Sequence, residues 1–197
     1  MSYEVNAGIL LRQLAEKSVE VAEQRAVKKD LSNAWSGIGF SLCGQTVVAP
    51  MGEVVEIITL PRYTLVPAVK SWMLGVANIR GRLLPIVDIE NFFGGRLGTA
   101  KSNYRVLIIE TQNTYVGLLV SKVFGLKHFD TSSFAYPTDE GSENIIDQPF
   151  TKFVDATCTE ITGVWYKLSP ARLVVDKNFI NAARTNAESG GGTVAAA

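Results

Sequence analysis

The sequence predicts an all-β protein built from two small barrels, and three observations lead to this prediction. From Gly37 to about Phe179, short runs rich in Val, Ile, Leu and aromatic residues are separated by Gly, Pro, Asn and Thr. Similar strand patterns recur in the two halves of this region, which indicates an internal repeat. The chain has 197 residues, of which 47% are hydrophobic, enough to fill a sizeable core.

Three β-hairpins are expected, because paired apolar stretches flank short turns. They join 38–43 to 46–51, 72–79 to 82–89, and 104–110 to 114–120. Gly44-Gln45 is expected to turn the first hairpin. Arg80-Gly81 turns the second, where glycine is available for a positive φ. The third has near-continuous apolar runs, which predict strands buried on both faces.

The repeat relates these hairpins to each other. The strands after the first and third hairpins, 53–57 and 122–126, are offset by about 68 or 69 positions, whereas 79–84 and 161–166 are offset by 82. The second half therefore carries an insertion, and the acidic stretch 137–149 is its best candidate. Each half has about five strands, and closure into a barrel removes exposed strand edges. We expect barrels at about 37–100 and 101–180, with exchange of the chain between them allowed.

The two ends differ from this region. Residues 1–35 carry ten charges, no proline and a thin apolar stripe, which predicts an N-terminal helical extension anchored by Trp35. The main domain is expected at 36–184. Residues 185–197 are rich in Gly, Ala, Ser and Thr and are expected to be a disordered tail.

Charge and composition argue against several classes of protein. Nineteen Lys and Arg balance nineteen Asp and Glu, so the basic surplus typical of nucleic-acid binding is missing. No apolar run reaches the roughly 18 residues of a transmembrane helix, and we expect a cytoplasmic protein. The two cysteines, Cys43 and Cys158, have no CxxC partner, which argues against a disulfide framework or a zinc cluster.

Catalytic constellations are also missing from the sequence. There is one histidine, His128, so a two-histidine zinc site cannot form, and GxSxG and phosphate-binding glycine motifs are not found. The pair Asp88 and Glu90 lies on an expected strand, where a structural role is favoured over acid–base catalysis. The sequence therefore predicts a binding or scaffold protein that is not an enzyme and has neither metal nor cofactor.

A long motif resembles a known family. Residues 72–88, Trp-Met-Leu-Gly-Val-Ala-Asn-Ile-Arg-Gly-Arg-Leu-Leu-Pro-Ile-Val-Asp, are similar to the signature of the CheW family, the coupling proteins of bacterial chemosensory arrays. The resemblance covers about residues 37–180. Residues 35–40, 48–54 and 61–67 look like its PilI branch, which belongs to chemosensory systems that control type IV pili and twitching motility.

The resemblance implies a fold and a role. The implied fold is two five-stranded SH3-like barrels. The implied function is a non-catalytic adaptor of a two-component system, which couples the cytoplasmic tip of a methyl-accepting chemoreceptor to the regulatory domain of a CheA-type histidine kinase. Its implied location is cytoplasmic, at membrane-associated receptor arrays, without insertion into the membrane.

The resemblance also implies receptor-binding residues. Arg80 matches the arginine of the family's Asn-hydrophobe-Arg-Gly motif, while Val54 and Glu56 match its Val-x-Glu-Ile stretch. Asn78 is expected to shape the turn before Gly81 through a side-chain hydrogen bond. Structural readings stay open at this point: Arg80 as a solvated turn residue, Glu56 as the partner of an arginine in its own barrel, and Val54 as a core residue.

Two other functions remain as alternatives. One is the same adaptor role in a flagellar chemotaxis array. The other, from a different class, is a small-barrel nucleic-acid-binding protein, which requires a basic groove with exposed aromatic side chains.

Overall fold

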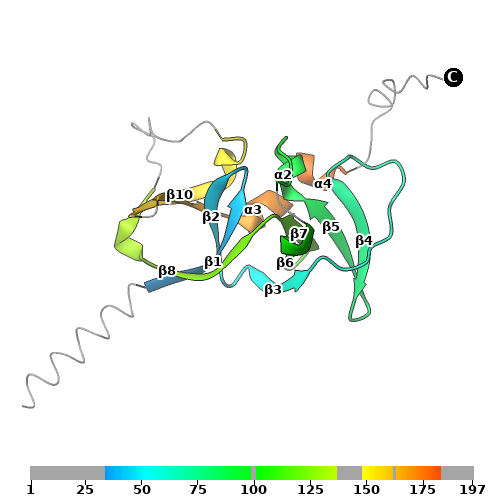
Figure 1. The fold of residues 1–197 in the computed structure, drawn as a ribbon, viewed down its shortest axis with the longest axis horizontal. Coiled ribbons are helices and arrows are strands. Elements are labelled where there is room, and N and C mark those ends of the chain that lie inside the picture. The colour runs from blue at the N-terminus through cyan, green and yellow to red at the C-terminus, as the bar shows by residue number, and fades with distance from the viewer. Residues whose placement is uncertain (1–33, 99–100, 137–147, 162, 183–197) are drawn as a thin grey trace, which may run out of the picture. The chain divides into compact units, whose positions relative to one another are not determined.

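The computed structural model describes residues 34–98, 101–136, 148–161 and 163–182, which fold mainly as β-strands (Figure 1). The strands are β1 (Ala34–Leu42), β2 (Gln45–Pro50), β3 (Val54–Thr59), β4 (Met73–Ile79), β5 (Arg82–Asp88), β6 (Arg105–Glu110), β7 (Tyr115–Val120), β8 (Val123–Asp130), β9 (Phe134–Ala135), β10 (Val154–Glu160) and β11 (Gly163–Leu168). The helices are α2 (Ile89–Phe92), α3 (Pro170–Val174) and α4 (Lys177–Ile180), with 3-10 turns η1 (Lys101–Asn103), η2 (Thr131–Ser133) and η3 (Thr151–Phe153).

The described residues fall into two compact units. The smaller unit contains 34–35 and 128–133, and the larger contains 36–127 and 134–182. In the smaller unit the rings of Trp35 and Phe129 lie 6.0 Å apart between centroids. Asp130 there accepts hydrogen bonds from the backbone N–H and hydroxyl of Ser132.

Two sheets dominate the structure, as the sequence predicts. One sheet has six strands in the order β8-β1-β2-β11-β10-β9, and the other has five in the order β3-β6-β7-β5-β4. The mostly β fold with two sheets is therefore confirmed. The sixth strand of the first sheet was not predicted, since the two-residue β9 pairs with β10 at a sheet edge and is too short to leave a pattern in the sequence.

All three predicted hairpins are present. β1 pairs with β2, β4 with β5, and β6 with β7, each in antiparallel register. The first turn lies one residue earlier than predicted, at Cys43-Gly44 instead of Gly44-Gln45. Its φ angles of +50° and +77° are both positive, as in the tight type I′ turns that suit strand twist.

Each sheet combines strands from both halves of the sequence, so that the chain passes between the sheets. In the first sheet β11, from the second half, pairs in parallel with β2. In the second sheet β5, from the first half, pairs in parallel with β7. When β1–β5 are matched to β6–β8, β10 and β11, the two sheets have the same strand order. The internal repeat is thus visible in the topology, with the third, fourth and fifth strands of each half exchanged.

A central apolar layer is shared by the two sheets. Phe40, Val47 and Tyr166 of the first sheet are buried in one cluster with Leu107 and Leu118 of the second. Because side chains alternate along a strand, the other face of the second sheet has its own core. That second cluster contains Ala77, Leu84, Ile86, Tyr104, Val106, Ile108 and Leu119.

A strap, residues 60–72, runs beside β4 and extends the second sheet. Thr64 and Val76 exchange two backbone hydrogen bonds of 2.9 Å. Gly75 permits this approach, because a Cβ built there would lie 2.3 Å from the Thr64 carbonyl oxygen and its φ is +152°. Glycine is therefore required at position 75, where the strap pairs with β4.

Gly75→Ala should destabilise the protein. The added methyl group must push the strap away and weaken the Thr64–Val76 bridge, which should cost about 1–3 kcal/mol in the free energy of unfolding. Urea denaturation of both variants measures this. Gly52→Ala is the control, because a Cβ at Gly52 meets nothing within 4 Å. Equal stability of the two variants would contradict the role assigned to Gly75.

A buried carboxylate also joins the two sheets. Glu90 of α2, which follows β5, is 4% exposed, and its Oε2 accepts the backbone N–H of Cys43 in the β1–β2 turn at 2.8 Å. Burial raises the pKa of Glu90, and the nearby charge of Asp88 raises it further, although hydrogen bonds from Cys43 and Ser121 oppose the shift. The carboxylate therefore binds its proton more tightly in the folded protein than in the unfolded chain.

This sign gives a pH-dependent prediction. Between the ordinary carboxyl value of 4.5 and the raised folded value, the contribution of Glu90 to stability should fall as pH rises. Glu90→Gln retains an acceptor for the Cys43 N–H but does not ionise, so its stability relative to wild type should increase from pH 4 to pH 7. Urea denaturation across this range is the measurement, with the exposed Glu160→Gln as control. A stability difference independent of pH would refute the interpretation.

Three predicted segments lie mostly or wholly outside the described residues: the helical extension 1–35, the acidic loop 137–149 and the tail 185–197. The described part of the first segment, Ala34 and Trp35, already belongs to β1. Among the residues that the structure describes, no helix is long and apolar enough to span a membrane.

Candidate functional site

The tip of the β4–β5 hairpin holds its arginine in an unusual backbone conformation. Arg80 has a φ of +52° and Gly81 a φ of +83°. Asn78 Oδ1 accepts the Gly81 N–H at 2.8 Å, which is the hydrogen bond expected at this turn. Asn or Gly is the preferred residue at the position of Arg80, because a Cβ crowds the backbone in the left-handed region; glycine has none, and the short polar side chain of asparagine compensates through local hydrogen bonds. An exposed arginine held there points to a role beyond the turn.

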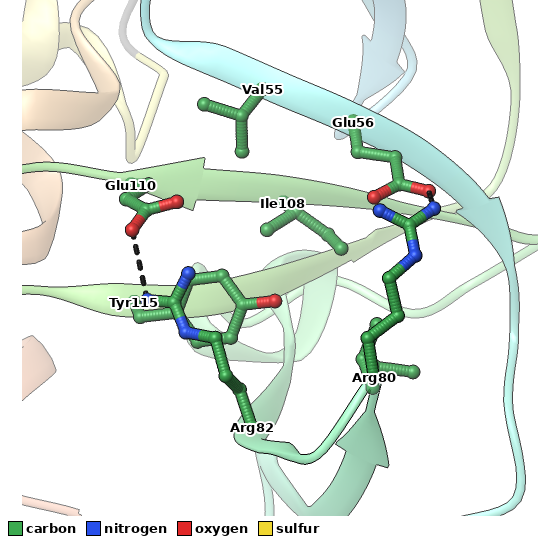
Figure 2. A pocket seen from close by; sticks show the side chains of 8 residues that line it. Val55, Glu56, Arg80, Arg82, Ile108, Glu110 and Tyr115 are labelled. Carbon is green, nitrogen blue, oxygen red and sulfur yellow. Dashed lines mark hydrogen bonds and ion pairs between the residues drawn. The ribbon is translucent and has the colours of Figure 1, made fainter.

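Arg80 and Glu56 form an ion pair. Arg80 Nη2 donates to Glu56 Oε1 at 2.7 Å, and the two side chains are 77% and 31% exposed. Glu56 lies on β3 and Arg80 at the hairpin tip, so the ion pair links these two elements (Figure 2). The structure thus brings together two of the three residues that the resemblance implies for receptor binding.

A bulge in β3 separates the third residue, Val54, from Glu56. In a regular strand, residues two positions apart point to the same face. Here the register with β6 shifts, with Val54 opposite Ile109 and Glu56 opposite Ile108. Ile109 faces the central layer and Ile108 the second core. Val54 is consequently a buried residue of the central layer, while Glu56 lies on the other side of β3.

A second ion pair, which no sequence pattern predicted, lies beside the first. Arg82 Nη2 donates to Glu110 Oε1 at 2.8 Å, and its guanidinium carbon lies 3.8 Å from the ring centroid of Tyr115. Glu110 and Tyr115 are opposite each other on β6 and β7. The predicted third hairpin places Glu110 near Tyr115, but the contact of Arg82 with both residues depends on the tertiary fold.

The two ion pairs border a cavity of about 250 Å³. Figure 2 shows Ile108 between the two ion pairs, and Val55 on the far side of Ile108 from the hairpin that carries Arg80 and Arg82. Next to this cavity, an apolar groove of about 580 Å³ is lined by Ile38, Met51, Gly52, Val54, Val55, Glu56 and Ile57. Met51, Val55 and Ile57 are 56%, 52% and 37% exposed. Val55 and Glu56 line both hollows, which are therefore adjacent.

This arrangement suits binding. An exposed apolar groove bordered by charged side chains accepts an amphipathic helix, whose apolar stripe enters the groove. Among the described residues, no group of three or more His, Cys, Asp or Glu could hold a metal ion. Burial and the neighbouring Glu90 raise the pKa of the Cys43 thiol to about 12, which keeps it protonated and a poor nucleophile.

Comparison with known proteins places the chain in a defined group. Residues 36–175 match the CheW-like domain family. The chain is 38% identical over 182 residues to Protein PilI of Pseudomonas aeruginosa, covering 88% of this chain and 94% of that protein. It is 25% identical to Chemotaxis protein CheW of Helicobacter pylori, covering 57% of this chain and 68% of that protein.

A solved structure shares the fold. The crystal structure of the scaffolding protein TtCheW from Thermoanaerobacter tengcongensis superposes with a TM-score of 0.60 and 23% sequence identity. The match covers 73% of this chain and 94% of that one.

The strained turn predicts that Arg80 is dispensable for folding. Arg80→Asn loses an exposed ion pair but gains a residue suited to a positive φ, so the free energy of unfolding should change by less than about 1 kcal/mol. Urea denaturation is the measurement. Leu84→Ala in the same hairpin removes a fully buried side chain and should cost about 2–5 kcal/mol. If Arg80→Asn is as damaging as Leu84→Ala, Arg80 has a structural role.

Proposed function

The chain belongs to the CheW-like domain family, and from this premise we propose that it couples a methyl-accepting chemoreceptor to a CheA-type histidine kinase. Members of this family are non-catalytic adaptors, which agrees with the prediction that the protein is not an enzyme. The observation that carries the proposal is the family match over residues 36–175 together with the apolar groove that ends at the Arg80–Glu56 pair. The domain is proposed to extend over 36–184, with each sheet closing as an SH3-like barrel.

We assign the receptor tip to the groove beside β3. Receptor tips of this class are helical, and Met51, Val55 and Ile57 offer exposed apolar contacts to one face of a helix. Arg80 donates one hydrogen bond to Glu56, so further N–H groups of its guanidinium are available for carboxylates or carbonyl oxygens of the receptor. Val54 lines the groove from its buried position, while Asn78 and Gly81 fix the conformation of the β4–β5 hairpin turn.

The system proposed is one that controls type IV pilus twitching motility. The similarity to Protein PilI over most of both chains supports it. The flagellar alternative has weaker support, from shorter and less similar matches to CheW proteins. The proposed location is cytoplasmic, at membrane-associated receptor arrays.

A nucleic-acid-binding role has less support. The ammonium groups of Lys127 and Lys167 lie over the rings of Trp165 and Phe134 at 5.5 Å. Both rings are more than nine-tenths buried. The exposed ring of Tyr136 lies 5.8 Å from the same Lys167, but one exposed ring is less than the series of ring faces on which successive bases stack.

The proposal is tested by binding of two purified partners, a receptor signalling-tip fragment and the regulatory domain of a CheA-type kinase. Calorimetric titration should detect both. Arg80→Glu places a carboxylate beside Glu56 and should weaken receptor binding at least about tenfold, with kinase binding unchanged. Arg62→Glu, at an exposed arginine outside the site, should bind both partners normally. The adaptor role fails if wild type binds neither partner at high micromolar concentration.

A further inference from the structure

The cavity between the two ion pairs has features that a purely charged contact site does not need. Its lining includes Ile108, a residue of the second apolar core, and the partly buried Ile79, which packs against that core. Val55 forms part of its outer border and is half exposed because it is the extra residue of the β3 bulge. Val55 thus brings apolar surface to solvent. Figure 2 shows Ile108 between Arg80–Glu56 on one side and Arg82–Glu110 on the other.

Arg82 is held as one wall of this cavity. Its guanidinium lies over the Tyr115 ring at 3.8 Å and is bound at its edge by Glu110 at 2.8 Å. The hydrogen bond to Glu110 raises the pKa of Arg82. Contacts to a ring and to a carboxylate restrict the side chain before any partner arrives, which lowers the entropy lost on binding.

The charges around the cavity cancel. Arg80 and Arg82 are balanced by Glu56 and Glu110, each within 2.8 Å of its partner. A charged side chain of either sign therefore meets no net opposite charge, and it would also lose water against the isoleucines. An uncharged, branched side chain gains from the apolar surface while the ion pairs keep their hydration at the rim. This is the pattern of an apolar anchor surrounded by contacts that exclude water.

We propose that this cavity is an anchor pocket for one aliphatic side chain, of leucine or isoleucine size, on the helical tip of the receptor, with Arg82 as its wall. The inference rests on the proposed function and extends it. The pocket shares Val55 and Glu56 with the apolar groove, so a helix in the groove reaches it. Arg82 then determines specificity through its shape and its stacking on Tyr115, whereas Arg80 acts through the N–H donors that its hydrogen bond to Glu56 leaves available.

Two substitutions at Arg82 separate shape from charge. Arg82→Met keeps an unbranched side chain that packs on Tyr115 but has no charge. Arg82→Ala removes the wall. Titration with the receptor signalling-tip fragment should show binding within about twofold of wild type for Arg82→Met and at least about tenfold weaker binding for Arg82→Ala. Arg62→Ala is the matched loss of an exposed arginine outside the site and should bind like wild type.

The side chain that enters the pocket is identified on the receptor fragment. Each aliphatic residue of its tip is changed to alanine in turn and titrated against wild type and Arg82→Ala. One position should lose affinity with wild type and lose little more with Arg82→Ala, because both changes remove the same contact. Kinase-domain binding should be unaffected throughout.

Several results overturn the anchor pocket. Equal losses for Arg82→Met and Arg82→Ala would show that Arg82 acts by charge, through an acidic residue that replaces Glu110. Unchanged binding of Arg82→Ala, with binding still lost in Arg80→Glu, would reject the pocket and leave the adaptor role intact. Self-association that wild type shows in sedimentation and Arg82→Ala lacks would assign the pocket to a second copy. If wild type does not bind the fragment, the proposed function and the pocket both fail.

Discussion

The apolar layer between the two sheets is the constraint on which the other features depend. Each sheet is completed by strands from the other half of the chain, through the parallel pairs β2–β11 and β5–β7. Neither sheet can therefore form fully without the other, and their inward faces meet in one cluster that includes Phe40, Leu118 and Tyr166. Purely apolar side chains such as those of Phe40 and Leu118 each contribute about 1.5–3 kcal/mol when they leave water. Glu90 adds a polar link at the edge of this layer by accepting the Cys43 N–H.

This scaffold allows an arginine to be placed where stability alone would not select one. The β4–β5 tip extends from a strand pair whose other end is fixed by the core, and its turn is closed by Asn78. The turn would accept Asn at the position of Arg80 with less backbone strain. Its exposed ion pair with Glu56 returns little stability, because surface pairs are weak. Under the proposed function, receptor binding accounts for such a residue.

Features of the site that depend on neighbouring residues could be predicted from the sequence, whereas contacts between residues far apart in the chain could not. Asn78, Arg80 and Gly81 are neighbours in one motif, so their turn could be derived locally, and its hydrogen bond is present. For Glu56 the sequence allowed a pairing with an arginine of its own barrel but did not indicate which arginine. The cluster of Arg82, Glu110 and Tyr115 was missed, because it joins a hairpin tip to two strands of the other half of the chain. No local pattern records which arginine reaches which carboxylate.

By itself the sequence determined the strands, the three hairpins and the absence of common catalytic motifs, because alternation and turn residues act over a few positions. Only the tertiary structure decided which strands share a sheet and which face of β3 each residue occupies. The bulge at Val55 moves Val54 into the central layer and Glu56 to the opposite side. Such a shift arises from the fit of β3 against β6, which are about fifty residues apart in the chain. The site therefore depends on a register that the apolar pattern of β3 does not specify.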